Sequence, residues 1–245
     1  AMDLGVLTVP LGDRPLGDAL DYLADLRVDA VELGCGGYPG SDHLDPVALL
    51  DDPDRRERLR TALSDRGVTI SALATHDNPL HPDDERADRA DADLRRAIRL
   101  ADALDVSTVT CFSGLPGGSP DDATPNWITA PWPPEHADAL EYQWDRATTY
   151  WREVAALADD HGVAVAIEMH PNMLVHEPHG LARLRAATND RIGANVDPSH
   201  LYWQGIDPVE AIRWLDDAVH HVHAKDTELY PSRCRTRGVL DTTAY

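Results

Sequence analysis

The stretch "VAVAIEMHP", residues 163–171, is an apolar run that ends in a carboxylate and an imidazole. β-Branched residues alternate with alanine up to Ile167, which is typical of a strand buried on both faces of a parallel sheet. Glu168 and His170 follow where the apolar run stops. Burying an unpaired carboxylate costs several kcal/mol, so we expect Glu168 to have partners at the ends of other strands.

The rest of the chain repeats this pattern. Further apolar runs rich in β-branched residues lie at 4–9, 28–34, 68–75, 106–114, 192–197 and 218–224. Segments with helical spacing separate them, for example Leu16, Ala19, Leu20 and Leu23. Strand and helix in regular alternation predict right-handed crossovers and a parallel sheet.

The fold predicted from this alternation is a parallel (β/α)8 TIM barrel in the α/β class. A doubly wound sheet is less consistent, because no GxGxxG turn follows the first strand. About seven β/α units are present, and the tail at 230–245 is too polar and irregular to supply the eighth. We therefore expect one domain over residues 1–245, incomplete at the C-terminus, with the last unit lying beyond residue 245.

The charge of the chain bears on its environment and on its partners. There are 43 acidic and 22 basic residues, a net charge of -21, and Lys225 is the single lysine. The charges are spread along the chain, which indicates a solvated acidic shell suited to high salt and hence a halophilic source. The same charge argues against nucleic acid as a partner, because a phosphate backbone is bound by clustered basic residues.

Neither a membrane span nor a secretion signal is expected. No run approaches the roughly 18 apolar residues that a spanning helix requires, and the first residues lack the charged and apolar segments of a signal peptide. Cys35, Cys111 and Cys234 form no CxxC pattern, so we interpret them as reduced thiols of a cytoplasmic protein.

Polar side chains recur at the ends of the predicted strands, and these ends meet at one mouth of a parallel barrel. They are Glu32, His76, Asn78, Glu168, Asp197, His200, His223, Lys225 and Asp226. Glu168, Asp197 and His223 follow three successive strands. Together they offer the mixed oxygen and nitrogen donors that suit Mn²⁺, Mg²⁺, Co²⁺ or Zn²⁺, and a shared cation would make burial of the carboxylates tolerable.

Each of these residues also has a simpler interpretation. Glu168 could form a buried salt bridge with an arginine, and Asp197 could cap the helix after it. His200 could be an exposed residue at a helix start, and Asp226 could merely pair with Lys225. Of the two histidines near 222, we expect His221 to face the helices and His223 the barrel interior. The Pro-, Gly- and Trp-rich segment 113–138 could be a lid over the mouth or a surface excursion.

Three motifs, "VAIEMHP", "NVDPSHLYWQG" and "HHVHAKD", resemble the fifth, sixth and seventh strand motifs of the xylose isomerase-like barrels of sugar phosphate isomerases and epimerases. "VDAVELGCGGYPG" and "SALATHDNPLHPD" are similar to that family's second and third. The resemblance implies a metal held by Glu168, Asp197 and His223, with a further glutamate on an eighth strand that has no counterpart here. It also implies a small-molecule sugar substrate. Enzymes of this family often pair, so the resemblance also allows a homo-oligomer.

The chemistry that the resemblance implies is proton transfer next to a ketose carbonyl through a metal-stabilised enediolate. Glu168 would be both metal ligand and acid/base. His200 and His76 would bind substrate hydroxyls, and we place Glu32, Asn78, Lys225 and Asp226 in the same substrate-binding set.

Three other functions stay open. Asp197 and His200 also resemble a ligand pair of apurinic-site endonucleases with three zinc ions, the endonuclease IV-like hydrolases of the same superfamily. That activity needs more histidine ligands and a basic surface, which the net charge of -21 opposes. A non-catalytic sugar-binding barrel is the second alternative. A metal-free glycosidase with two carboxylates ranks last, because it leaves Asp197, His200 and His223 unused.

The acidic shell predicts that salt stabilises the protein. The Debye length falls from about 10 Å at 0.1 M to about 3 Å at 1 M salt, which weakens repulsion between surface carboxylates. We expect the melting temperature to rise as KCl increases into the molar range, measured by circular dichroism. A melting temperature that stays flat or falls would contradict the halophilic interpretation.

Overall fold

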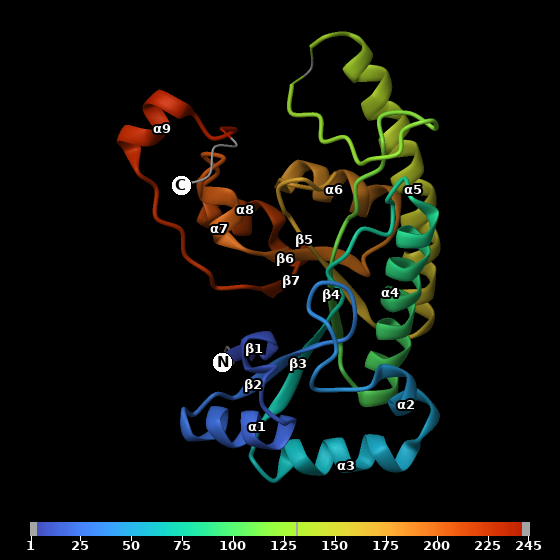
Figure 1. Cartoon of the computed structure of the whole chain (residues 1–245), viewed down its shortest axis with the longest axis vertical. Helices are drawn as coiled ribbons and strands as arrows, with labels where there is room; N and C mark the ends of the chain where they lie inside the picture. Colours follow the sequence, from blue (N-terminus) through green and yellow to red (C-terminus); the bar gives the residue numbers. More distant parts are fainter. Residues whose placement is uncertain (1–3, 131, 242–245) are drawn as a thin grey trace.

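A computed structural model describes residues 4–130 and 132–241 and shows one parallel sheet that curls into an incomplete barrel (Figure 1). Its strands are β1 (Gly5–Leu7), β2 (Ala30–Gly34), β3 (Thr69–Ala74), β4 (Thr108–Phe112), β5 (Ala164–Glu168), β6 (Ile192–Val196) and β7 (Val219–Val222). Each strand pairs in parallel with the next along the chain, in the order β1 to β7. The predicted TIM-barrel class, incomplete after about seven units, is confirmed.

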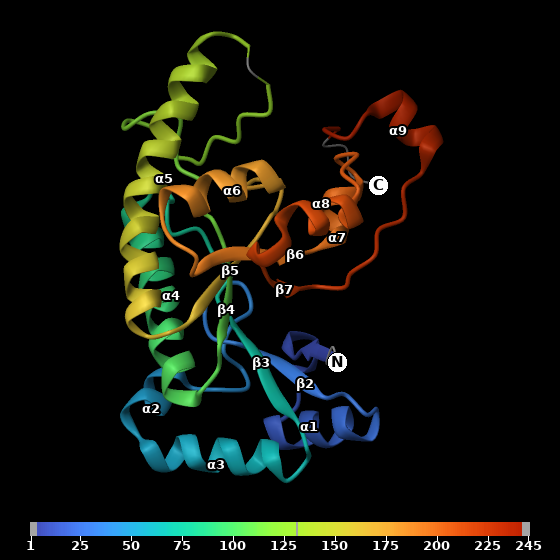
Figure 2. The ribbon, with the colours of Figure 1, turned by 180° about the vertical axis from the view of Figure 1, so that it is seen from behind.

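Helices surround this sheet. They are α1 (Leu16–Asp25), α2 (Pro46–Asp51), α3 (Pro53–Ser64), α4 (Asp84–Leu104), α5 (Glu135–Asp160), α6 (Pro178–Ala187), α7 (Pro198–Tyr202), α8 (Pro208–Leu215) and α9 (Pro231–Arg237), with short 3-10 turns η1 (Val9–Leu11) and η2 (Asp216–Ala218). Figures 1 and 2 show the long α4 and α5 side by side along one flank.

An acidic residue followed by proline starts several of these helices. Asp45, Asp52, Asp197 and Asp207 cap α2, α3, α7 and α8, and each accepts hydrogen bonds from backbone N–H groups of the first turn. Proline suits the first helical position because its missing N–H would have no partner there. Some of the excess acidic residues of the chain therefore serve as N-terminal caps of helices.

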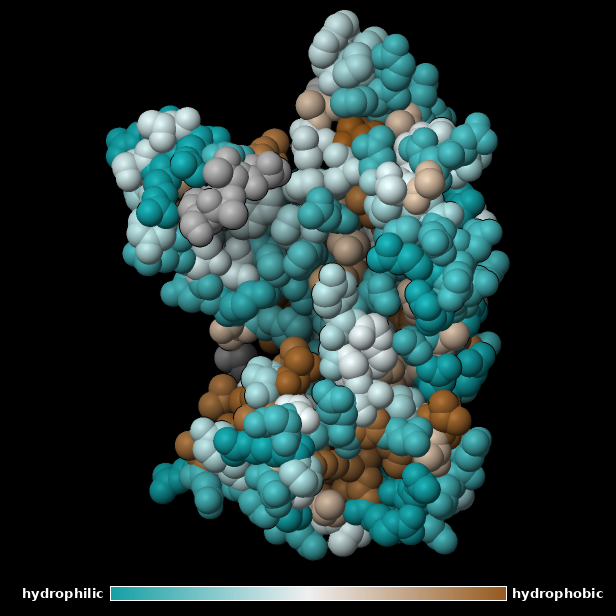
Figure 3. Space-filling model, viewed as in Figure 1, coloured by the Kyte–Doolittle hydropathy of each residue, from teal (hydrophilic) through white to brown (hydrophobic). Residues whose placement is uncertain are grey.

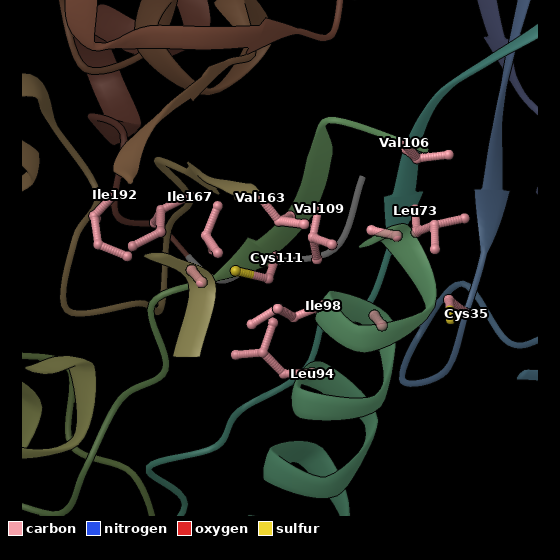
Figure 4. Packing of buried hydrophobic residues seen from close by; sticks show 14 of the residues in the cluster. Cys35, Leu73, Leu94, Ile98, Val106, Val109, Cys111, Val163, Ile167 and Ile192 are labelled. Atoms are coloured by element: carbon pink, nitrogen blue, oxygen red, sulfur yellow. The ribbon is translucent and has the colours of Figure 1, made fainter. Parts of the chain in front are cut away.

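The hydrophobic core fills the space between the sheet and its helices. Figure 4 shows Leu94 and Ile98 of α4 pointing toward Cys111 of β4, with Ile167 of β5 beside them. Trp151 of α5 is fully buried, and its indole N–H donates to the carbonyl of Ser113 at 2.9 Å. The core thus fixes the point at which the chain leaves β4, next to the carboxyl ends of β5 and β6.

The two edges of the sheet, β1 and β7, lie on the same side of the molecule in both ribbon views (Figures 1 and 2). Among the described residues no ladder joins β1 to β7. The C-terminal segment was predicted to be irregular, but residues 231–237 form α9; residues 242–245 of that segment lie outside the described residues. Proline at the first position of α9 favours this short helix.

The visible surface is mostly hydrophilic, as expected from the charge. Figure 3 shows one face dominated by polar residues, with hydrophobic side chains visible mainly in the lower half around α1 to α3. No helix within residues 4–130 and 132–241 is both long and apolar enough to cross a membrane.

The burial of the cysteines predicts their reactivity. Burial raises the pKa of Cys35 to about 12, with a further contribution from Asp93, and burial also raises the pKa of Cys111. Cys234 on α9 is partly exposed. We expect a disulfide-exchange reagent to label one thiol quickly in the native protein, and Cys234→Ser to abolish that fast phase. Two fast thiols in the native protein would contradict this packing.

Candidate active site

Glu168, the last residue of β5, is the centre of the polar cluster at the carboxyl ends of the strands. Its Oε2 lies 3.0 Å from His76 Nε2 and 3.0 Å from His223 Nδ1, and its Oε1 lies 3.2 Å from His200 Nε2. The alternative of a salt bridge from Glu168 to an arginine is wrong, because its ion-pair partners among the described residues are histidines. Residues that follow β3, β6 and β7 therefore meet at the carboxylate that ends β5.

Glu32 of β2 holds the other side of the cluster. Its Oε2 lies 2.8 Å from His223 Nε2 and 3.2 Å from His221 Nε2, and the Thr110 hydroxyl donates to Oε1. The expectation that His221 faces the helices is wrong, since residues two apart on a strand point to the same side. Both imidazoles consequently face the barrel interior.

Burial and pairing act in opposite directions on the pKa values of this cluster. Burial alone would raise the pKa of Glu168, but hydrogen bonds from His200, His223 and His76 outweigh it and hold the pKa far below 4.5. Hydrogen bonds from His221 and His223 likewise hold the pKa of Glu32 below its ordinary value against the effect of burial. For His223, burial would lower the pKa, yet bonds to Glu168 and Glu32 raise it to about 10. His223 is thus a charged imidazolium between two carboxylates.

Asp197 combines two roles that the sequence left as alternatives. Its Oδ1 accepts from the Ser199 backbone N–H at 2.9 Å and so caps α7. Its Oδ2 faces the cluster, 2.8 Å from Lys225 Nζ and 3.4 Å from His200 Nε2. Asp197 is 1% exposed, so its second oxygen is available only within the barrel interior.

The structure leaves two predicted substrate-binding residues outside this cluster. Asn78 uses its amide on backbone groups: Oδ1 accepts from the N–H of Leu80 and of Leu115, and Nδ2 donates to the Leu115 carbonyl. Asp226 is exposed and accepts from the Thr227 N–H. The suggestion that Asp226 is the partner of Lys225 is wrong, because the Lys225 ammonium pairs with Asp197.

Asn195 of β6 is a member of the cluster that the sequence analysis missed. Its Nδ2 lies 3.2 Å from Glu168 Oε2 and 3.1 Å from His223 Nδ1, and its Oδ1 is buried without a hydrogen-bond partner. An amide inside the apolar run "IGANV" was the available signal. Thr110, a polar residue in the middle of the apolar strand β4, was also missed. His170 was identified only as a residue at a strand end, and in the structure its ring packs against His200.

The long segment after β4 is attached to the barrel rather than loose. Gln143 of α5 is fully buried and donates to the carbonyls of Asn126 at 2.6 Å, Gly117 at 3.2 Å and Pro116 at 3.3 Å. The Trp127 ring packs edge-on against His176 at 5.5 Å between centroids. These contacts hold residues 116–127 near the loop that follows β5.

The donor atoms fit a divalent cation in several combinations. Within the described part of the chain, three sets of donors lie within 4.8 Å of one another: Glu32, His221 and His223; His76, Glu168 and His223; and Glu168, His170 and His200. Asp197 belongs to none of them, but it contacts His200, which contacts Glu168. Carboxylate and imidazole donors of this kind suit Zn²⁺, Co²⁺ or Mn²⁺.

Comparison with known proteins agrees with this geometry. The profile of a family described as xylose isomerase-like TIM barrel matches residues 20–241. The chain belongs to this family. The resemblance inferred from the strand motifs is therefore confirmed.

Other proteins resemble the chain over most of its length. The uncharacterized protein YfiH of Bacillus subtilis (strain 168) is 40% identical over 245 residues, 98% of this chain and 78% of YfiH. The 3-keto-D-glucoside 4-epimerase YcjR of E. coli superposes with a TM-score of 0.68 at 13% identity, over 92% of this chain and 80% of that chain. IolI, solved with a zinc atom, superposes with a TM-score of 0.65 at 18% identity, over 94% and 74%.

The position of His223 between two carboxylates predicts a pH dependence of stability. Its pKa in the folded state is about 10 against an ordinary 6.5, so its contribution is complete below pH 6.5 and is lost as the pH rises through 10. We expect the free energy of unfolding in urea and EDTA to fall from about pH 7 to about pH 10, and to fall less in His223→Gln. His136→Gln on α5 is the control, and parallel curves for wild type and His223→Gln would contradict the imidazolium.

Proposed function

We propose that this protein is a metal-dependent isomerase or epimerase of a sugar or sugar phosphate. The observation that carries the proposal is Glu168, a buried carboxylate in contact with His76, His200 and His223 at the carboxyl ends of parallel strands. Active sites of TIM barrels lie at this end. Family membership supports the same class of reaction, since neighbours of similar fold include the sugar epimerase YcjR.

The residues proposed to hold the cation are Glu168, Asp197 and His223, of which His223 would release its imidazolium proton when the ion binds. Asp197 contacts His200, His200 contacts Glu168, and Glu168 contacts His223, which supports the assignment of the three residues to one site. Asn195 supports it with a buried carbonyl oxygen that has no partner. A divalent cation there would polarise a sugar carbonyl and neutralise charge that develops on its oxygen.

The side chains of this chain can carry the proton transfer. Glu168 is held ionised by its three imidazole contacts, which is the protonation state of a general base, although the same contacts weaken its basicity. A substrate that took over some of these contacts would raise its pKa and let it accept a proton from the carbon beside the carbonyl. His76 and His200 each present one N–H to this carboxylate and are placed to bond a neighbouring sugar hydroxyl. Lys225, with 57% of its side chain exposed, holds Asp197 and can contact a substrate oxygen from the solvent side.

Surface charge separates this proposal from the endonuclease-like alternative. A net charge of -21 repels a phosphate backbone, whereas it does not hinder a neutral sugar. Cytoplasmic location and reduced thiols belong to the same proposal, in keeping with the buried Cys35 and Cys111. A non-catalytic sugar-binding barrel would bind a sugar without converting it, so a measurement of turnover separates it from the proposal.

Substitution of the proposed acid/base residue Glu168 tests its role in turnover directly. Wild-type protein with added Mn²⁺ or Co²⁺ should exchange the proton next to the carbonyl of one ketose or ketose phosphate in a panel, followed by deuterium incorporation in NMR. Glu168→Gln should lower that rate by about 10²–10⁴-fold, the range for a positioned acid/base group. Glu141→Gln, an exposed residue of α5, is the matched control. A Glu168→Gln variant with the wild-type rate would refute the role of Glu168, and a wild type inactive on the whole panel would favour the binding barrel.

A further inference from the structure

Gln204 is a partly buried residue just after the end of α7, and the proposed reaction assigns it no role. Its Nε2 lies 2.7 Å from the carbonyl oxygen of His200 and 3.0 Å from the carbonyl oxygen of His176. Its Oε1 lies 3.1 Å from His176 Nδ1. One side chain thus connects the segment after β5 with the helix that carries His200.

The two carbonyl contacts fix the orientation of the Gln204 amide. A carbonyl oxygen only accepts hydrogen bonds, so the atom that faces both carbonyls must be the amide nitrogen, which has two N–H groups to donate. The amide oxygen is then the acceptor, and His176 donates to it from Nδ1. Both ends of the amide are therefore paired with groups of the chain itself.

The carbonyl of His200 lies at the end of a very short helix. The helix α7 spans five residues, Pro198–Tyr202. The last carbonyls of a helix have no N–H partner within it, and so short a helix is not stable on its own. The side chain of Gln204 supplies a donor to the His200 carbonyl. This bond restrains the backbone of His200 where the helix restrains it least.

The contacts that the His200 ring makes in the site depend on where this backbone lies. Its Nε2 lies 3.2 Å from Glu168 Oε1 and 3.4 Å from Asp197 Oδ2, and its ring centroid lies 4.2 Å from that of His170. Packing against His170 limits the tilt of the ring, whereas the position of the backbone decides how far Nε2 reaches toward the carboxylates. An outward displacement of about 1 Å would take the contact with Glu168 beyond hydrogen-bonding distance.

The network around Gln204 also reaches the segment after β4. The Trp127 ring packs edge-on against the His176 ring, with 5.5 Å between centroids. Gln143 in turn bonds to carbonyls within residues 116–126 of the same segment. Gln204 therefore connects α7 with the loops after two other strands, and both loops are themselves attached to the barrel.

We propose that Gln204 is a positioning residue, which holds His200 against Glu168 by donating to the His200 backbone carbonyl. This role rests on the proposed function, in which His200 binds a substrate hydroxyl. Gln204 acts through His200 and needs no contact with the substrate. Its bond from His176 holds the amide in place, and its bond to the His200 carbonyl carries the effect.

Two variants separate the donor of this amide from its acceptor. At pH 7 Gln204→Glu keeps the size of the side chain and an oxygen that accepts from His176, but it places no donor opposite the two carbonyls. Gln204→Met keeps an unbranched side chain and removes both functions. The proposal predicts that both variants behave alike, whereas a purely structural bond to His176 would leave Gln204→Glu like the wild type. Val209→Ala on α8, where Val209 is 53% exposed, is the control.

The imidazole signals of His200 provide a readout that requires no turnover. They are recorded by ¹H–¹⁵N NMR on the metal-free protein and assigned by their loss in His200→Gln. We expect these signals to shift or broaden in Gln204→Glu and in Gln204→Met, and to stay in place in Val209→Ala. Near-ultraviolet circular dichroism checks that each variant is folded. Unchanged His200 signals in Gln204→Glu, or in both Gln204 variants, would overturn the proposal.

The deuterium assay measures the consequence for the reaction. Gln204→Glu and Gln204→Met should each lower the exchange rate by about 10- to 100-fold, since a displacement of about 1 Å in a reacting geometry has an effect of that size. Val209→Ala should keep the wild-type rate. Wild-type rates in both Gln204 variants would also overturn the proposal. A wild type that converts no substrate would refute the proposed function, and the NMR signals alone would then decide whether Gln204 positions His200.

Discussion

The interaction on which the site depends is the sharing of His223 between two buried carboxylates. Glu32 and Glu168 come from β2 and β5, and unpaired burial of either would cost several kcal/mol. The His223 imidazolium, 2.8 Å from one and 3.0 Å from the other, offsets their charge and holds both sides of the curled sheet to the start of the segment after β7. The same ring is one of the ligands proposed for the catalytic ion.

Local rules of helix initiation position the remaining donors. Asp197 begins α7 because its Oδ1 caps the first turn and Pro198 suits the first helical position. Since α7 starts there, His200 lies one turn further on, with its Nε2 between Asp197 and Glu168. Asp197 therefore uses one carboxylate oxygen to cap α7 and directs the other into the barrel interior. The residue that starts the helix thus also contributes a donor atom to the site.

The segments around the mouth are fixed by buried polar contacts rather than by apolar packing alone. The Ser113 carbonyl accepts from Trp151, and its hydroxyl accepts from the Val175 N–H at 3.0 Å, which connects the loops after β4 and β5. Asn78 similarly joins the loops after β3 and β4 through Leu115. Such bonds make this end of the barrel rigid enough to keep donor atoms at fixed separations, which any acid/base or metal chemistry requires.

The sequence by itself determined the fold class, the seven strands and most members of the cluster. Buried parallel strands have a distinctive pattern, and the carboxyl ends of parallel strands must meet, so Glu168, Asp197, His200 and His223 could be grouped without coordinates. Only the tertiary structure decided which side chains and backbone groups these residues contact. That His223 faces Glu32 as well as Glu168, that His221 points inward, and that Asn78 bonds to backbone depend on how far the sheet curls and on shifts of register between β2 and β3 and between β6 and β7. Curl and register arise from contacts between residues far apart in the chain, which no local pattern encodes.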